Sequence, residues 1–318
     1  MITVFYILGY LAFLGFIFLA VTKLWTYKTA SPLHARWELY PVPHEGYRAS
    51  YGGSFMEDKE WWNKSRHISH IGDIIGMLSE ILLLKATFEH NLKLWVRSYP
   101  FHLGMYMLMG GTIIVFISTI IQICCGISPS TIIMTIHDGG ILTLINNLIN
   151  AMVFMGAAGI IAGGLALIER RKNDIGLAKF TTAEHYLNLW AFVLFGVFTM
   201  IAWAFNPSFY VLATTFVYNL LTFNFASLSS LSFTISLLIG FALLIMIPIT
   251  NMGHLIMKYH MYHDIRWGDE PTHYSEDNKK KIGEMLQFRP TWSAPHIDGN
   301  GSKTWVDVAT TNPASEEK

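Results

Sequence analysis

The sequence has 318 residues, of which 52% are apolar and only 14% are charged. A mean hydropathy of +0.38 excludes an ordinary soluble protein and indicates a membrane protein, while a formal net charge of zero says little about partners. The two cysteines, Cys124 and Cys125, are adjacent, which excludes the CxxC and Cys/His spacings that hold an iron–sulfur cluster or a zinc ribbon.

Five apolar runs are long enough to cross a membrane, since about 20 apolar residues span the hydrocarbon core. They cover roughly residues 3–25, 101–125, 141–168, 185–206 and 232–256. The first run has no basic region before it and no cleavage site after it, so we expect a retained anchor. The expected fold class is all-α and integral to the membrane, with five transmembrane helices.

The lysines and arginines predict how these helices are oriented, because cytoplasmic loops hold the excess of positive charge. Residues 23–97 contain ten of them, residues 169–183 contain four and residues 258–318 contain eight, which is the full complement of 22. The two other loops, 126–140 and 207–231, contain none. This partition predicts that the N-terminus is outside and the C-terminus is cytoplasmic.

Two further segments are expected to stay on the membrane surfaces. Residues 71–92 place apolar side chains along one helical face, with Asp73 and Glu80 on the other side, which predicts an amphipathic helix on the inner surface. Residues 207–231 are uncharged and rich in Asn, Thr, Ser and aromatic residues. We expect a short outer-surface helix or a folded loop there, because a sixth crossing would place the basic tail outside.

The sequence predicts four regions. They are the first transmembrane helix (1–27), a cytoplasmic arm with the amphipathic helix (28–98), a four-helix membrane region (99–257) and an extended cytoplasmic tail (258–318). The arm and the tail are rich in aromatic residues and turn formers but poor in aliphatic runs, so neither is expected to form a core alone. We expect them to dock a partner subunit, with an ordered cap over the protein's own helices as the alternative.

Four of the 13 histidines lie near membrane depth: His102, His137, His185 and His254. His102 is at the inner end of the second helix and His254 is at the inner end of the fifth. Because these helices run in opposite directions, both imidazoles are expected at a similar depth. Two such histidines on neighbouring helices can bind a haem iron from both faces, and interfacial hydrogen bonding is the alternative. His185 is a substitute ligand, but its neighbours Thr181, Thr182 and Glu184 indicate a helix start, so we interpret it as a capping-region residue.

Two segments, PFHLGMYMLMGG and SLLIGFALLIMIPITNMGH, resemble the second and fifth helices of the nitrate reductase gamma subunit, a five-helix, N-out cytochrome b that oxidises quinol. WELYPVPHE and TWSAPHIDGNGSKTWVDVATTNP resemble a narrower branch, the membrane cytochrome b subunits of the sulfite-reduction-associated complex and related heterodisulfide-reductase-linked transmembrane complexes.

The resemblance implies that His102 and His254 are the axial ligands of an inner haem b. It also implies an outer haem, but the corresponding positions here are Thr112 and Ser236, whose hydroxyls are not ordinary haem ligands. One haem is therefore expected, and the only outer candidates are His137 and the sulfurs of Met134, Cys124 and Cys125.

The resemblance implies a subunit of a quinol-linked oxidoreductase in the bacterial cytoplasmic (inner) membrane. Such a subunit exchanges electrons between menaquinol and a cytoplasmic iron–sulfur subunit of heterodisulfide-reductase type, with further membrane and periplasmic cytochrome c subunits as additional partners and no nucleic acid. Two alternatives stay open: a quinone reductase fed by the partner or by a periplasmic cytochrome c, and a cofactor-free membrane anchor of a redox complex.

His137 and Asp138 stand together in the outer loop before the third helix. An acid–histidine pair at the membrane face can accept the protons of a quinol, since histidine titrates near neutral pH. The alternative is a capping aspartate beside a solvated histidine. A site there would lie about 30 Å from His102, because about 20 helical residues separate the two.

Overall fold

A computed structural model of the chain describes residues 2–29, 57–60, 63–65, 69–136, 138–254, 276–294, 297–299 and 301–311. This part of the chain is helical apart from one pair of two-residue strands. It divides into two units, residues 1–21 with 78–254 and residues 22–77 with 255–318. Five of the described helices are long and apolar enough to cross a membrane, so the prediction of an all-α, multi-pass membrane protein is confirmed at this level.

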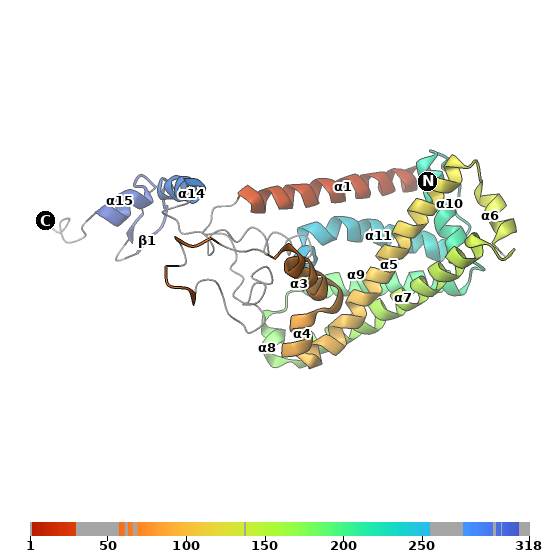
Figure 1. Cartoon of the computed structure of the whole chain (residues 1–318), viewed down its shortest axis with the longest axis horizontal. Coiled ribbons are helices and arrows are strands. Elements are labelled where there is room, and N and C mark those ends of the chain that lie inside the picture. Colours follow the sequence, from red (N-terminus) through yellow and green to blue (C-terminus); the bar gives the residue numbers. More distant parts are fainter. Residues whose placement is uncertain are drawn as a thin grey trace. The chain divides into compact units, whose positions relative to one another are not determined.

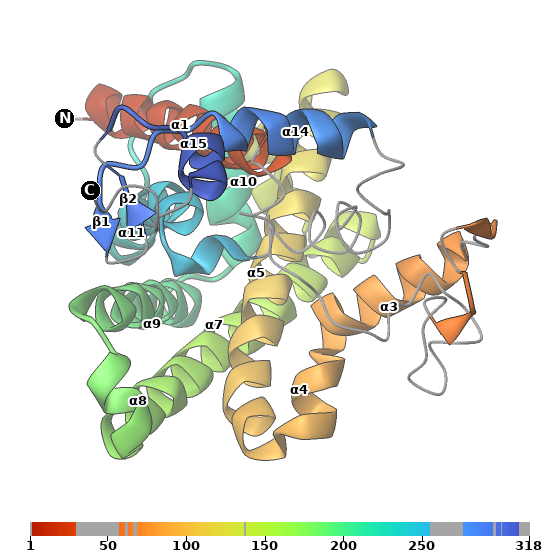
Figure 2. The same cartoon turned by 90° about the vertical axis from the view of Figure 1, so that its left-hand side faces the viewer.

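The five long helices are α1 (Ile2–Thr29), α5 (Leu92–Cys124), α7 (Ile141–Asn173), α9 (Ala183–Ala204) and α11 (Leu231–Ile249). The last four pack in chain order, α5 against α7, α7 against α9 and α9 against α11 (Figures 1 and 2). In the described part of the chain, α5 and α11 make no comparable interface with each other. α1 lies along α11, where its Gly9 and Gly15 contact Phe241 and Ile245.

The α5–α7 crossing brings two backbones into direct contact. A Cβ atom added at Gly104 of α5 would lie 2.6 Å from the carbonyl oxygen of Gly156 on α7. A Cβ atom at Gly159 would lie 2.6 Å from the carbonyl oxygen of Pro100. In a membrane, helix association depends on van der Waals packing, and small residues permit this close approach. The crossing therefore fixes the part of α5 that includes Pro100 and Gly104.

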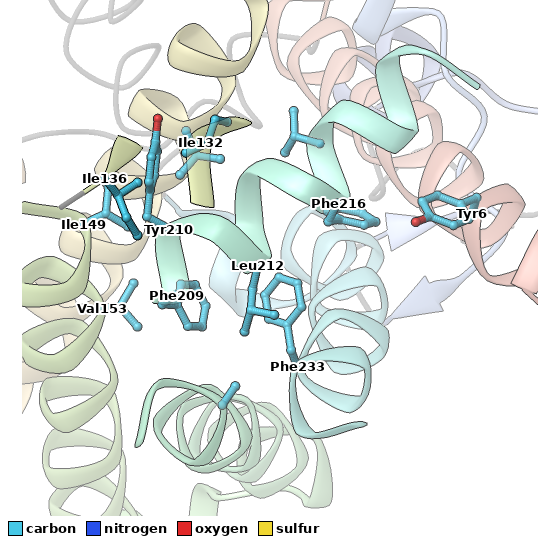
Figure 3. Close-up of a cluster of buried hydrophobic side chains, with 13 residues drawn as sticks. Tyr6, Ile132, Ile136, Ile149, Val153, Phe209, Tyr210, Leu212, Phe216 and Phe233 are labelled. Carbon is cyan, nitrogen blue, oxygen red and sulfur yellow. The ribbon is translucent and has the colours of Figure 1, made fainter. Parts of the chain in front are cut away.

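The uncharged stretch between α9 and α11 contains the short helix α10 (Phe209–Leu221), as the sequence predicts. It is more than a surface helix, because about half of its side chains are buried. Its Tyr210 and Phe216 join Tyr6 of α1 and Phe233 of α11 in one hydrophobic cluster (Figure 3). α10 thus fills the space between these helices at the end of the bundle opposite His102.

Hydrogen bonds hold the beginning of α10 against α5 and α7. The Ser208 hydroxyl donates to Asn146 Oδ1 (2.6 Å), and the backbone N–H of Phe209 donates to Asn150 Oδ1 (3.2 Å). Gln122 Nε2 donates to the Tyr210 hydroxyl (2.7 Å). All of these groups are at least partly buried, where an unpaired polar group would be costly. These hydrogen bonds therefore define the position of α10 more precisely than apolar contacts alone would.

The predicted amphipathic segment forms α3 (His70–Leu83) and α4 (Lys85–His90), which are separated by Leu84 in the left-handed region (φ 51°). The apolar side chains of α3 are exposed along one face. Two aromatic residues of α5 donate hydrogen bonds to its last carbonyls: the Tyr106 hydroxyl to that of Ile81, and Trp95 Nε1 to that of Leu83 (2.8 Å). These bonds satisfy helix-end acceptors and tie α3 to α5.

The remaining short elements are α6 (Pro129–Thr135), α8 (Ile175–Phe180), a 3₁₀ turn η5 (Asn251–Gly253), α14 (Glu276–Leu286), the antiparallel strands β1 (Ser293–Ala294) and β2 (Ile297–Asp298), and α15 (Trp305–Thr310). The sequence predicts an extended tail, but its described part has local folded structure. Trp292 packs edge-on against Trp305 with ring centres 5.9 Å apart, and the backbone N–H of Trp305 donates to the carbonyl of Phe288 (3.0 Å). Aromatic contacts thus organise a segment that lacks aliphatic runs.

Asp307 makes the stability of α15 dependent on pH. Its carboxylate accepts hydrogen bonds from the backbone N–H (2.8 Å) and the hydroxyl (2.7 Å) of Thr304, and these bonds lower its pKa below the ordinary value of 3.8. Because the pKa is lowered on folding, the stabilisation is complete above pH 3.8 and is lost as the pH falls through the folded value. We expect the amides of residues 305–311 to lose protection against hydrogen exchange below about pH 3.8, relative to their intrinsic rates. Exchange measured by mass spectrometry should show this loss in the native chain but not in Asp307→Asn, and equal protection at pH 3 and pH 6 in the native chain would contradict it.

Candidate functional site

His102 lies further inside its helix than the sequence predicts. The apolar run starts at residue 101, but α5 begins at Leu92, where the Asn91 side chain accepts a hydrogen bond from the backbone N–H of Leu94 (3.0 Å). The helix then continues through Pro100, as membrane helices often do. His102 is therefore in the third turn of α5, where helix packing fixes the backbone.

His254 follows a break that the sequence does not predict. The apolar run continues to residue 256, but α11 ends at Ile249, one residue after Pro248. Thr250 is extended (φ −104°, ψ −178°), and its side chain accepts a hydrogen bond from the backbone N–H of Met252 (3.4 Å) in η5. His254 comes directly after this 3₁₀ turn, so a short turn and not a continuous helix sets its position.

The two histidine rings lie close together. Their ring centres are 6.2 Å apart, and the ring planes are inclined at 63°. Two imidazoles bound to opposite faces of one metal have ring centres about 6 Å apart, because each metal–nitrogen bond is about 2 Å and each ring centre lies about 1.1 Å beyond its nitrogen. The spacing therefore fits a single iron between the two rings.

The hydrogen bonds of the pair favour the tautomer with the proton on Nδ1 of each ring. His102 Nδ1 lies 2.9 Å from the carbonyl oxygen of Ser98 and 3.2 Å from the Ser98 hydroxyl, and His254 Nδ1 lies 3.1 Å from the carbonyl oxygen of Asn251. A carbonyl oxygen only accepts, so in this tautomer Nδ1 donates to the carbonyl and the lone pair is on Nε2. Metal-binding histidines commonly have this arrangement, in which the second ring nitrogen donates to a carbonyl.

Aromatic residues surround His102 on α5. Phe101 is 2% exposed and packs edge-on against Phe192 of α9, with ring centres 5.3 Å apart. The Tyr106 ring lies 6.3 Å from that of His102, centre to centre. One turn before the histidine, Arg97 pairs with Glu169 of α7 (3.5 Å). His102, which is half-buried, thus lies between an apolar core and a charged helix end, whereas His254 is exposed.

His185 caps a helix, as its neighbours predict. Thr182 and His185 form a reciprocal capping box at the start of α9, in which the backbone N–H of Thr182 donates to His185 Nδ1 (3.2 Å). Its other ring nitrogen, Nε2, lies 3.2 Å from the side-chain amide of Asn251. His185 is therefore linked to the turn before His254.

The outer positions do not form a second pair of ligands. The Thr112 hydroxyl donates to the carbonyl of Leu108 in its own helix (2.8 Å), and the Ser236 hydroxyl shares a hydrogen bond with Thr199 (2.6 Å). Asp138 is exposed, whereas its neighbour His137 lies outside the described residues. The sulfur-containing candidates Met134, Cys124 and Cys125 are exposed.

Two buried polar atoms could not be identified from the sequence. Gln122 Oε1 and Asn188 Oδ1 are buried without a hydrogen-bond partner among the described residues. Within the described ranges, no group of three or more His, Cys, Asp or Glu side chains could hold a metal ion, but a bis-histidine haem requires only two side chains.

Comparison of the chain with family models, curated proteins and solved structures finds no match.

Proposed function

We propose that the protein is the cytochrome b subunit of a quinol-linked oxidoreductase, in which His102 and His254 bind one haem b. The supporting observation is the geometry of this pair, with ring centres 6.2 Å apart and both Nδ1 atoms hydrogen-bonded to backbone carbonyls. A haem bound by two histidines supplies one-electron transfer, because both axial positions of its iron are filled. The chain holds the two rings and orients their Nε2 lone pairs.

The packing of the outer half supports a single haem. The hydroxyls at Thr112 and Ser236 have partners within the protein, and the space between α1 and α11 at that end is filled by α10. Without an outer haem, a quinol oxidised beside Asp138 would be about 30 Å from His102, too far for direct electron transfer. We therefore place the quinone site nearer the histidine pair than the outer loop.

The distribution of charge supports an orientation with the histidine pair near the cytoplasm. Basic residues follow α1 and α7 and precede α5, whereas the loops at the opposite end have none. We therefore propose that the N-terminus is outside, that the C-terminus is in the cytoplasm of a bacterium and that the apolar face of α3 lies on the inner surface of the membrane. Tyr106 and Trp95 hold α3 against α5 at this level.

The physiological donor and acceptor follow from the resemblance of the sequence. Menaquinol is proposed as the quinone substrate, and an iron–sulfur subunit of heterodisulfide-reductase type is proposed as the cytoplasmic partner. The arm (28–98) and the tail (258–318) are proposed to dock that partner. The two exposed rings of Trp292 and Phe288 near the start of the folded tail segment are suitable interface residues.

Haem stoichiometry tests this proposal most directly. The purified protein should contain one haem b per chain, measured as the pyridine haemochrome against protein mass, with a b-type reduced-minus-oxidised spectrum. Two haems per chain would show that the outer half also binds iron. A haem-free protein would contradict the proposal and leave a cofactor-free membrane anchor.

A further inference from the structure

His254 is connected by hydrogen bonds to a neighbouring helix. The Asn251 carbonyl oxygen accepts from His254 Nδ1 (3.1 Å), and the Asn251 side chain lies 3.2 Å from His185 Nε2 at the start of α9. His185 Nδ1 is in turn bound to the backbone N–H of Thr182 (3.2 Å). One residue, Asn251, thus contacts the proposed ligand through its backbone and α9 through its side chain.

The proton positions along this chain of hydrogen bonds follow from the chemistry of imidazole. His185 Nδ1 accepts from the Thr182 N–H, so in the neutral ring the proton is on Nε2. The Asn251 amide nitrogen, Nδ2, lies 3.2 Å from Nε2, and turning the amide by half a rotation exchanges its nitrogen and oxygen so that Oδ1 accepts from Nε2–H. The Thr182 N–H then donates to His185, and both His185 and His254 donate to Asn251, the first to its side chain and the second to its carbonyl oxygen.

The local backbone explains why His254 needs such a connection. α11 ends at Ile249, and only Thr250 and the three residues of η5 separate that end from His254. A turn of this length lacks the repeated hydrogen bonds of a long helix and has poorer hydrogen-bond geometry. The hydrogen bonds of this segment include one from the Met252 N–H to the Thr250 hydroxyl (3.4 Å) and one from the Thr250 N–H to the Met246 carbonyl of α11 (3.0 Å).

We propose that His185 and Asn251 are positioning residues for the axial ligand His254. His185, fixed by the capping box of α9, holds the Asn251 side chain, and Asn251 holds the plane of the His254 ring through its carbonyl. This inference rests on the proposed function, because it assigns the pair a role toward a haem ligand. Neither residue touches the iron in this assignment.

Two variants distinguish a positioning role toward His254 from a role in capping α9 alone. In His185→Gln the glutamine can still accept from the Thr182 N–H, as glutamine does in capping boxes, but it cannot also reach Asn251. In Asn251→Ala the backbone carbonyl stays and the side chain is lost. We expect each variant to retain haem but to lose it to an excess of a haem-scavenging protein about tenfold faster than the native protein. The double variant should be no faster than either single variant, because both remove the same connection.

The EPR spectrum supplies a readout that loss of stability alone would not change. The g values of a low-spin haem with two imidazole ligands depend on the angle between the ring planes, so both variants should shift or broaden them in the same way. Asn206→Ala removes an amide that donates to the Ala202 carbonyl (2.6 Å) at the far end of α9, and it should change neither haem loss nor the g values. Additive effects of the two variants, or unchanged g values, would overturn the inference while the haem assignment stands. A haem-free native protein would overturn the proposed function and this inference together.

Discussion

His102→Ala and His254→Ala are each expected to abolish binding of haem b. Each substitution removes one of the two imidazoles whose ring centres lie 6.2 Å apart, and on the proposed function the remaining histidine would leave the iron with an open axial position. The low-spin spectrum should therefore be lost in both variants, and the haem content of the purified protein should fall close to zero. Pyridine haemochrome and the reduced-minus-oxidised spectrum measure both effects.

The control for this experiment is His185→Ala. This histidine is at the same end of the bundle as the pair, but both of its ring nitrogens face groups of the protein, Thr182 and Asn251. The variant should retain haem in near-stoichiometric amount even if the haem dissociates faster. A native haem content in His102→Ala or His254→Ala would remove the ligand assignment.

Gly159→Ala is expected to destabilise the bundle strongly although it adds only one methyl group. The added Cβ would lie 2.6 Å from the carbonyl oxygen of Pro100, and backbone atoms of two packed helices cannot move aside as a flexible side chain can. We expect a loss of about 2 kcal/mol in the free energy of unfolding, within the range for overpacked sites. Because Pro100 is two residues before His102, haem affinity should fall as well. Thermal unfolding in detergent, followed by circular dichroism and by Soret absorption, measures both effects.

Gly110→Ala is the matched control in α5. There the nearest atom to an added Cβ is the terminal methyl group of the flexible Met152 side chain, at 3.2 Å. Alanine also favours the helix over glycine by up to about 1 kcal/mol, so this variant should be close to neutral in stability. Equal effects at Gly159 and Gly110 would show that the backbone contact at Pro100 is not what holds α5 and α7 together.

The sequence predicts the five long helices well because their apolar runs are longer than those of helices in the core of a soluble protein. It predicts their ends less well. The first turns of α5 contain Lys93 and Arg97, so the hydropathy of the sequence predicts that the helix begins at residue 101. In the structure, the helical hydrogen bonds begin at Leu92. The end of α11 cannot be predicted from hydropathy, because apolar residues lie on both sides of the break at Thr250.

The histidine pair could be placed from the sequence because depth in a membrane depends on position along the helices. Counting residues along the helices predicts a similar depth for His102 and His254, and in the structure their ring centres lie 6.2 Å apart with the ring planes inclined at 63°. The contact between His185 and Asn251 was not predictable in this way, because it depends on how a break in one helix meets the cap of another. The sequence does not predict the burial of α10, because an uncharged, largely apolar segment of this length can also lie on a membrane surface; the hydrophobic cluster and the partners Asn146 and Gln122 explain why it packs inside.

The packing of α10 across the outer end also bears on the energetics of turnover. A charge that crosses the whole membrane gains or loses about 2.3 kcal/mol for each 100 mV of membrane potential. On the proposed function, a single haem lies near the cytoplasmic face and α10 occupies the place of an outer haem, so electrons would enter and leave the protein on the same side of this field. The driving force is then the difference in reduction potential between quinol and acceptor alone, and the reaction rate should be the same in energised and de-energised membranes.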